Sequence, residues 1–237
     1  MEIVVRSWNV FHGNADPPGR AGHLHRMIEL VTRDAPDIVC LQELPVWAIA
    51  RVEAWSGMHH FDAITRPPLW PGPLGTWVTR MHQGFFRSGL AGQANAILVA
   101  PRHAATALGH ERISENRRER RLVHAVRIAG APGVTVGNLH ASNDFARPDV
   151  PRAEAARAAA FVEEAATPGD VLVLAGDFNV RDPLLAAYSK PVDGIDHVLV
   201  RGAAAMTVVA WPLEQRRQHR VVLSDHPVVE ARIEVGA

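Results

Sequence analysis

The chain of 237 residues has a single cysteine and no long apolar run. With Cys40 alone, no intrachain disulfide can form, and its place inside the apolar residues 38–41 predicts a buried, unreactive thiol in a reducing compartment. No apolar stretch approaches the roughly 20 residues that cross a bilayer, and strand-like sequence follows Met1 and Glu2 without a signal peptide. We therefore expect a cytoplasmic protein without a membrane span.

The chain also lacks an excess of charge, since Lys+Arg and Asp+Glu both total 25. It therefore has no global basic field of the kind expected of a strong non-specific nucleic-acid binder, although local basic patches remain possible. No Gly/Ser or Pro linker divides the sequence, and we find no internal repeat. A hydrophobic content of 47% is sufficient for one large core, so we expect a single domain over residues 1–237.

Short apolar runs dominate the remaining pattern and predict more strands than helices. The strands are expected at residues 2–8, 38–42, 94–100, 104–109, 122–128, 134–139, 171–175, 195–200, 206–211 and 226–235. Helices are expected at residues 24–35, 44–55 and 152–166, and the Pro- and Gly-rich residues 57–92 are expected to form an irregular insertion or lid. This mixed order predicts an α/β (α+β) fold of packed sheets with helices outside.

Polar side chains stand where many of these strands end. Residues 174–179 deliver Asp177 and Asn179 directly after an apolar run. Taken alone, such a segment has about even odds of being an ordinary turn. Similar groups, however, close other strands, at Asn9, Glu43, Asn138 with His140, Asp196, and Asp225 with His226. Because strand ends hold reactive groups rigidly at a crevice, the series predicts one site.

The set of candidate ligands is rich in oxygen. Carboxylates and amides are preferred by hard cations, so the sequence indicates Mg²⁺ or Mn²⁺ as the cofactor rather than Zn²⁺. Histidines beside carboxylates can be held protonated or act as bases near neutral pH. Carboxylates, a hard metal and histidines together suit phosphoryl chemistry, in which water attacks in line while charge on the phosphate is neutralised.

The ordered motifs resemble the endonuclease/exonuclease/phosphatase superfamily with its deoxyribonuclease I-like fold. They are WNVFHG (8–13), DIVCLQE (37–43), QANAILVAPR (93–102), GNLHASND (137–144), LAGDFN (174–179), IDHVLV (195–200) and SDHPVV (224–229). The resemblance spans nearly the whole chain. It implies a four-layer sandwich in which two packed mixed β-sheets are flanked by helices.

The resemblance implies a metal site and a water-activating group. Glu43 would be the principal metal ligand, Asn9 its neighbour in metal or phosphate binding, and Asp225 would lie near the metal. Asp177 would position or deprotonate the attacking water, and Asn179 would orient that water and contact the phosphate.

The resemblance also implies roles for two histidines. His226 would form a dyad with Asp196 and act on the scissile phosphate as base or charge stabiliser. His140 resembles the second histidine of the nuclease and sphingomyelinase-like branches and is a candidate proton donor to the leaving oxygen. Asn138, at the same strand end, is expected to steady the site or bind substrate.

Substrate contacts are expected from two further segments. In this family an arginine near the start of strand 122–128 often contacts the substrate phosphate, which makes Arg120 or Arg121 a candidate. Residues 112–121 mix basic and acidic side chains, however, and such a segment is usually a solvated loop. Trp70 and Trp77 lie in the Pro/Gly-rich segment, where aromatic side chains either pin a loop to the core or stack on a ligand.

The sequence departs from the family pattern on one helix. Many members carry an Arg followed by a Gln after the His140 motif, whereas here Arg152 precedes Glu154 and Ala155, so that the helix is expected to have lost a supporting contact. In residues 57–92, where substrate choice usually resides, we find no signature of a subfamily. The branch therefore stays open.

The sequence thus predicts a divalent-metal-dependent phosphoesterase, and more specifically a phosphodiesterase because His140 accompanies His226. The substrate could be a nucleic acid, a phospholipid head group or a smaller phosphodiester, and no protein partner is evident. The alternatives are an endo- or exonuclease acting on DNA or RNA and, less favoured, a catalytically silent binding member of the family.

Overall fold

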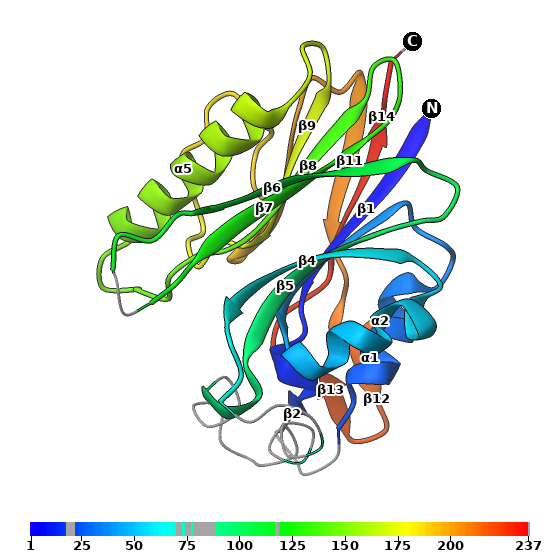
Figure 1. The fold of residues 1–237 in the computed structure, drawn as a ribbon, viewed down its shortest axis with the longest axis vertical. Coiled ribbons are helices and arrows are strands. Elements are labelled where there is room, and N and C mark those ends of the chain that lie inside the picture. Colours follow the sequence, from blue (N-terminus) through cyan, green and yellow to red (C-terminus); the bar gives the residue numbers. More distant parts are fainter. Residues whose placement is uncertain (18–21, 70–72, 74–76, 78–88, 117–118, 237) are drawn as a thin grey trace.

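The computed structural model describes residues 1–17, 22–69, 73, 77, 89–116 and 119–236, and within them two large sheets pack face to face (Figure 1). The larger sheet has the order β11 (Ala205–Ala210), β14 (Val229–Glu234), β1 (Glu2–Asn9), β3 (Ile38–Leu44), β5 (Gln93–Val99) and β4 (His59–Arg66). The second has the order β10 (Asp196–Arg201), β9 (Val171–Asp177), β8 (Val134–His140), β7 (Leu122–Ile128) and β6 (Ala105–Arg112). A small sheet joins β12 (Arg217–Gln218), β13 (Val221–Leu223) and β2 (Ala15–Asp16).

Helices cover the outer faces of both large sheets. The larger sheet carries α1 (Leu24–Thr32), α2 (Ile49–Ser56) and the short helices η1 (Phe11–Gly13) and η2 (Val46–Ala48), and the second sheet carries α5 (Asp149–Ala165). The four-residue helix α6 (Leu213–Arg216) precedes β12. The predicted α/β (α+β) fold of two mixed sheets between helices is therefore confirmed (Figure 1).

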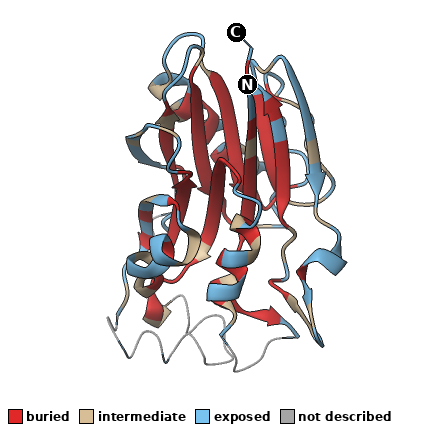
Figure 2. Ribbon diagram, turned by 90° about the vertical axis from the view of Figure 1, so that its right-hand side faces the viewer, coloured by how far each residue is buried: buried red, intermediate tan, exposed pale blue. Residues whose placement is uncertain are grey.

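The strands read as continuous apolar runs because both faces of each central strand are buried (Figure 2). On β3, Ile38 and Cys40 point into the core between the two sheets, whereas Val39 and Leu41 pack under the helices of the larger sheet. Cys40 is buried, as predicted, and this burial raises the pKa of its thiol. A fully buried aliphatic side chain of this size contributes about 1.5–3 kcal/mol.

Helix α5 lies close to β8 because small residues face each other there. Ala155, Ala158 and Ala159 are buried on the helix, and a Cβ added at Gly137 on β8 would collide with the side chain of Val162. The helix begins at Asp149, three residues before the predicted start. The Asp149 carboxylate lies in the first turn, where it stabilises the helix by interacting with the positive end of the helix dipole.

The prediction of irregular structure over residues 57–92 is wrong at its beginning. Residues His59–Arg66 form β4, an edge strand that pairs only with β5 among the described strands. Only Ala63 and Thr65 of this strand are buried, so that β4 lacks the continuous apolar run that marks the central strands. Most of residues 70–88 lie outside the described part of the chain, and so does the expected lid.

Strand direction brings the polar strand ends together. β1 runs parallel to β3, β8 runs parallel to β9, and β10 runs antiparallel to β9. The ends of β1, β3, β8 and β9 and the beginning of β10 therefore carry the predicted site residues to one end of the sandwich. No helix among the described residues is long and apolar enough to cross a membrane.

Candidate active site

The carboxylate of Asp177 lies at the centre of the site. Its Oδ2 is 3.0 Å from the donating Nδ2 of Asn9, 3.5 Å from Nε2 of His140 and 3.8 Å from Nδ1 of His226. Oδ1 accepts a hydrogen bond from the backbone N–H of Asn179 at 3.0 Å. One carboxylate thus joins groups from β1, β8, β9 and the loop that precedes β14.

The environment of Asp177 favours its protonated form. The residue is 1% exposed, and burial together with the nearby charge of Asp196 raises its pKa to about 7, against the opposing effect of His226 and the hydrogen bonds from Asn9 and Asn179. A carboxylate with a pKa near neutrality can take a proton from water at the pH at which the enzyme would work. The position fits the predicted role of activating water.

Asn179 is fixed beside this carboxylate by its backbone and by its side chain. It adopts a left-handed conformation with φ of 51°, which asparagine tolerates better than most residues. Its Nδ2 donates to the carbonyl of Ala141 at 2.9 Å, and the N–H of Ala141 donates to the carbonyl of Asp177 at 2.8 Å. The loops after β8 and β9 are therefore tied together.

His226 and Asp196 form the predicted dyad geometry. Nδ1 of His226 lies 2.9 and 3.1 Å from the two carboxylate oxygens of Asp196. Burial alone would lower the pKa of His226, but the hydrogen bond and charge of Asp196, with smaller effects of Asp177 and Asp225, raise it to about 10. Asp196 therefore favours the charged form of His226.

The loop that carries His226 is anchored by Ser224. This residue has φ of 58°; its hydroxyl donates to the carbonyl of Asn9 at 2.6 Å and accepts from the N–H of His226 at 3.1 Å. The indole N–H of Trp8 donates to the carbonyl of His226 at 3.0 Å. The loop is consequently tied to the end of β1, which holds Asn9 in place.

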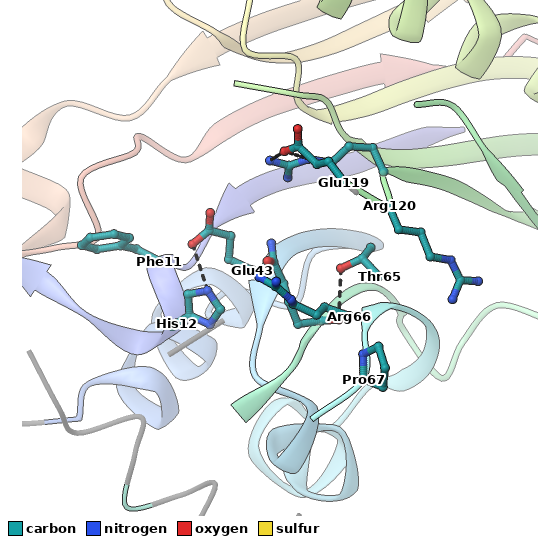
Figure 3. Close-up of a pocket in the computed structure, with 10 residues that line it drawn as sticks. Phe11, His12, Glu43, Thr65, Arg66, Pro67, Glu119 and Arg120 are labelled. Carbon is teal, nitrogen blue, oxygen red and sulfur yellow. Dashed lines mark hydrogen bonds and ion pairs between the residues drawn. The ribbon is translucent and has the colours of Figure 1, made fainter. Parts of the chain in front are cut away.

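Glu43 lies on the floor of the adjoining cleft, at the bulged end of β3. Its φ is 55°, and its side chain is 21% exposed, with Oε2 at 3.4 Å from Nε2 of His12 and Oε1 at 4.0 Å from Nε2 of His140 (Figure 3). Asp225 lies beside the same centre, with Oδ1 at 3.8 Å from Nε2 of His226. Burial, Glu43 and Asp196 raise the pKa of Asp225, although His226 opposes this.

This donor set fits a hard divalent cation. Glu43 and Asp225 are the more exposed carboxylates, and the charge of Glu43 contributes to the raised pKa of Asp225, an effect that a bound cation would oppose. Ligand atoms of Asp177, Asp196 and His226 also lie within 4.8 Å of one another. In that trio His226 is already committed to Asp196, so that Glu43, Asp225 and the amide oxygen of Asn9 remain the better candidates for the metal.

His140 differs from His226 in its surroundings. It is 3% exposed, its Nε2 faces Asp177 and Glu43, and its Nδ1 lies 3.3 Å from Nε2 of Gln93. Burial, with smaller effects of the charges of Arg121, His226 and His12, lowers its pKa well below the usual range. The surroundings therefore shift the pKa values of His140 and His226 in opposite directions.

A cleft of about 490 Å³ opens above Glu43 (Figure 3). Its lining residues are Phe11, His12, Glu43, Thr65, Arg66, Pro67, Gln93, Glu119, Arg120 and Arg121. Arg121 donates through Nε to Oε1 of Glu119 at 2.8 Å and is mostly buried, whereas Arg120 is exposed. Both predicted arginines thus border the cleft, and Arg121 is the one whose guanidinium is oriented.

Asn138 lies in the core between the sheets, where it has no access to the cleft. It is fully buried, its Nδ2 donates to the carbonyls of Leu41 and Ala96 at 3.0 Å each, and its Oδ1 accepts from Nε2 of Gln42 at 2.8 Å. Because these bonds connect β8 with β3 and β5, the expectation of a substrate contact is corrected: Asn138 holds the two sheets together beneath the site.

Glu154, one of the residues that depart from the family pattern, supports the loop after His140. It is 1% exposed, and its carboxylate accepts from the backbone N–H of Ser142 at 2.6 Å and from the Ser142 hydroxyl at 2.7 Å. The expectation of a lost contact is therefore wrong, because a glutamate holds the loop after His140. Trp70 lies outside the described residues, and Trp77 is 58% exposed, so that their substrate role stays a prediction.

Several cleft residues were missed or left undecided in the sequence. His12 follows Asn9 in the loop after β1, which was a signal, and it proves to be buried against Glu43. Gln93 opens one of the motifs, but glutamine at a strand start has no distinctive chemistry. Thr65 and Arg66 lie on β4, the strand that the sequence did not predict, so that no signal pointed to them.

Comparison with known proteins agrees with this architecture. A model of the Endonuclease/Exonuclease/phosphatase family matches residues 7–226. The chain belongs to this family. Comparison with curated protein sequences gave no significant match.

Several solved structures share the fold across almost the whole chain. Truncated Caenorhabditis elegans TDP2 has a TM-score of 0.68 at 17% identity, with 99% of this chain and 98% of that chain covered. A functionally unknown conserved protein from Enterococcus faecalis has a TM-score of 0.70 at 14% identity, with coverages of 98% and 99%. The catalytic domain of human Nocturnin with bound sulfate has a TM-score of 0.66 at 13% identity, with coverages of 98% and 93%. At such identities the likeness shows the fold alone.

Proposed function

We propose that this family member is a divalent-metal-dependent phosphodiesterase that hydrolyses its substrate by in-line attack of water. The observation that carries the proposal is the position of Asp177, whose Oδ2 lies within 3.8 Å of Asn9, His140 and His226. A buried carboxylate between two histidines and an amide, beside a cleft with arginines, has the parts required for phosphoryl transfer.

Each residue of the site has a separate role in the proposed reaction. Asp177 receives a proton from the attacking water, and the amide of Asn179 orients that water. The imidazolium of His226, fixed by Asp196, stabilises negative charge that develops on the phosphate. His140 faces the same region from β8, close to the leaving oxygen, and Arg120 and Arg121 bind phosphate oxygens from the wall of the cleft.

Mg²⁺ or Mn²⁺ would be held by Glu43, with Asn9 and Asp225 nearby, and would act as a Lewis acid on a phosphate oxygen. The oxygen donors around Glu43 support this assignment.

Hydrolysis of bis(p-nitrophenyl) phosphate with Mg²⁺ or Mn²⁺, compared with the same reaction in EDTA, tests the proposal. Asp177→Asn and His226→Ala should each lower kcat by about 10²–10⁴ fold, as expected for groups that transfer protons or stabilise charge. Asp34→Asn, an exposed residue distant from these strand ends, is the matched control and should have no effect. Equal rates in Asp177→Asn and the parent would refute the proposal.

A nuclease acting on DNA or RNA is the alternative within the same chemistry, and a silent binding member is less favoured. The fold relatives that include TDP2 and Nocturnin do not decide between them. The absence of net charge and the pairing of Arg121 with Glu119 favour a smaller or partly apolar phosphodiester over long duplex DNA. We also propose a cytoplasmic location, for which the single buried thiol is the support.

The preference is tested with a panel of plasmid DNA, RNA, phospholipids and small phosphodiesters. Plasmid DNA should be cut slowly compared with the best small or lipid substrate. Trp70→Ala or Trp77→Ala should change the ratio of rates between substrates more than the rate on the generic one. Rapid nicking of plasmid at physiological salt, unaffected by either substitution, would assign the chain to the nuclease alternative.

A further inference from the structure

We propose that Glu154 on α5 is a positioning residue that holds the side chain of Asn179 in the place from which it would orient the attacking water. The proposal rests on the proposed phosphodiesterase function and deepens it. The carboxylate of Glu154 is buried, so that it acts through the loop after β8 and does not touch the substrate.

The first contact joins α5 to the loop after β8. One carboxylate oxygen of Glu154 accepts from the backbone N–H of Ser142 at 2.6 Å, and the other accepts from the Ser142 hydroxyl at 2.7 Å. Both residues are buried, so that water does not compete for these bonds. A hydrogen bond to a carboxylate is roughly twice as strong as one between neutral groups, and two of them fix Ser142 in position and rotation.

The second contact joins the same loop to the loop after β9. The carbonyl of Ala141 accepts from Nδ2 of Asn179 at 2.9 Å, and the N–H of Ala141 donates to the carbonyl of Asp177 at 2.8 Å. Ala141 thereby contacts both residues that would act on the attacking water.

One peptide group connects these two contacts. The carbonyl of Ala141 and the N–H of Ser142 belong to the same peptide unit, which is planar. If this unit rotated, the acceptor of Asn179 and the donor to Glu154 would move together. Glu154 therefore fixes the direction of the carbonyl that Asn179 binds.

The side chain of Asn179 depends on that carbonyl. Within the described part of the chain, it is the one group to which Nδ2 donates. An amide group is planar, so the bond from Nδ2 also sets the direction of Oδ1, which can accept a hydrogen bond from water. A displaced Ala141 carbonyl would therefore turn the amide oxygen away from the attacking water.

Close packing of α5 on β8 keeps Glu154 from following the loop. A Cβ added at Gly137 on β8 would collide with the side chain of Val162, which shows how near the helix lies to the strand. Glu154 lies on the same helix, about two turns toward its N-terminal end. The carboxylate is thus fixed by the fold, and the loop after β8 takes its position from it.

Two substitutions at Glu154 separate the position of the side chain from its charge. Glu154→Gln keeps the length and an acceptor for the Ser142 N–H, and should retain most of the kcat for bis(p-nitrophenyl) phosphate. Glu154→Asp keeps the charge but is one methylene shorter, and should lower kcat about 10- to 100-fold with little change in KM, because the orienting group is displaced while the cleft remains. Glu164→Asp, at an exposed glutamate near the other end of α5, is the matched control and should have no effect.

A double-variant comparison tests whether Glu154 acts through Asn179. In Asn179→Ala the side chain that Ala141 holds is gone, so that adding Glu154→Asp should lower kcat by less than about twofold. A general weakening of the fold would instead lower kcat by the same factor in both backgrounds. Ser142→Ala removes only the hydroxyl bond, and it takes the place of Glu154→Asp if that variant does not fold.

Proton–nitrogen NMR spectra test the contacts without a reaction. The side-chain amide signals of Asn179, identified with Asn179→Ala, should shift in Glu154→Asp and stay in place in Glu164→Asp. Unchanged Asn179 signals in Glu154→Asp, or equal losses of kcat in the two backgrounds, would overturn the proposal. A parent that hydrolyses no phosphodiester would refute the proposed function, and the Asn179 signals would then decide by themselves whether Glu154 positions this residue.

Discussion

The hydrogen-bonded pair of His226 and Asp196 should behave as one functional unit. The pair is joined at 2.9 Å, and both side chains are largely removed from solvent, with exposures of 18% and 3%. A hydrogen bond between charged groups contributes about 1.5–3 kcal/mol, which corresponds to roughly a 10- to 150-fold change in rate if it is fully expressed in the transition state. Asp196→Ala should therefore lower kcat by that factor.

His226→Ala should have the larger effect, about 10²–10⁴ fold, because it removes the group that acts on the phosphate. The double variant His226→Ala/Asp196→Ala should be scarcely slower than His226→Ala, since Asp196 then has no imidazole to orient. The double-mutant cycle compares the parent, the two single variants and the double variant, whose rates are measured with a nitrophenyl phosphodiester at saturating metal. Thermal unfolding checks that each variant is folded. Fully multiplicative losses would refute the pairing.

Three other predictions concern the metal, the pH dependence of stability and the packing of α5. Glu43→Gln should raise the dissociation constant for Mn²⁺ at least tenfold in calorimetric titration and lower activity at limiting Mg²⁺; an unchanged affinity would remove Glu43 from the ligand set. Burial lowers the pKa of His124 to about 4, so between pH 6.5 and 4 the unfolded chain binds a proton that the folded chain does not. The free energy of unfolding should therefore fall by up to about 3 kcal/mol as the pH falls through this window. The urea midpoint of His124→Phe should change less with pH across this window than that of the parent. Gly137→Val should destabilise the fold by about 1–3 kcal/mol in urea, because the new side chain collides with Val162; a stability equal to that of the parent would contradict the close approach.

The sequence by itself determined the architecture and the kinds of group in the site. The central strands are buried on both faces, so each appears as an apolar run, and strand Leu122–Ile128 has the bounds that were predicted. Polar residues stand where such runs begin or end, and for this reason the sequence alone assigns Asn9, Asp177 and Asp196 to one site. This information is local in the chain, and local patterns are what a sequence displays.

The tertiary structure alone decided which groups are paired and in what state. Asn138 closes a strand as His140 does, but its bonds to Leu41 and Ala96 on the facing sheet place it in the core. Gln93 reaches His140 only because β5 and β8 meet across the sandwich. Both contacts join residues more than 40 positions apart, and their hydrogen bonds depend on how the sheets pack. Burial and neighbouring charge then shift the pKa values of His140 and His226 in opposite directions, although the sequence shows only two histidines.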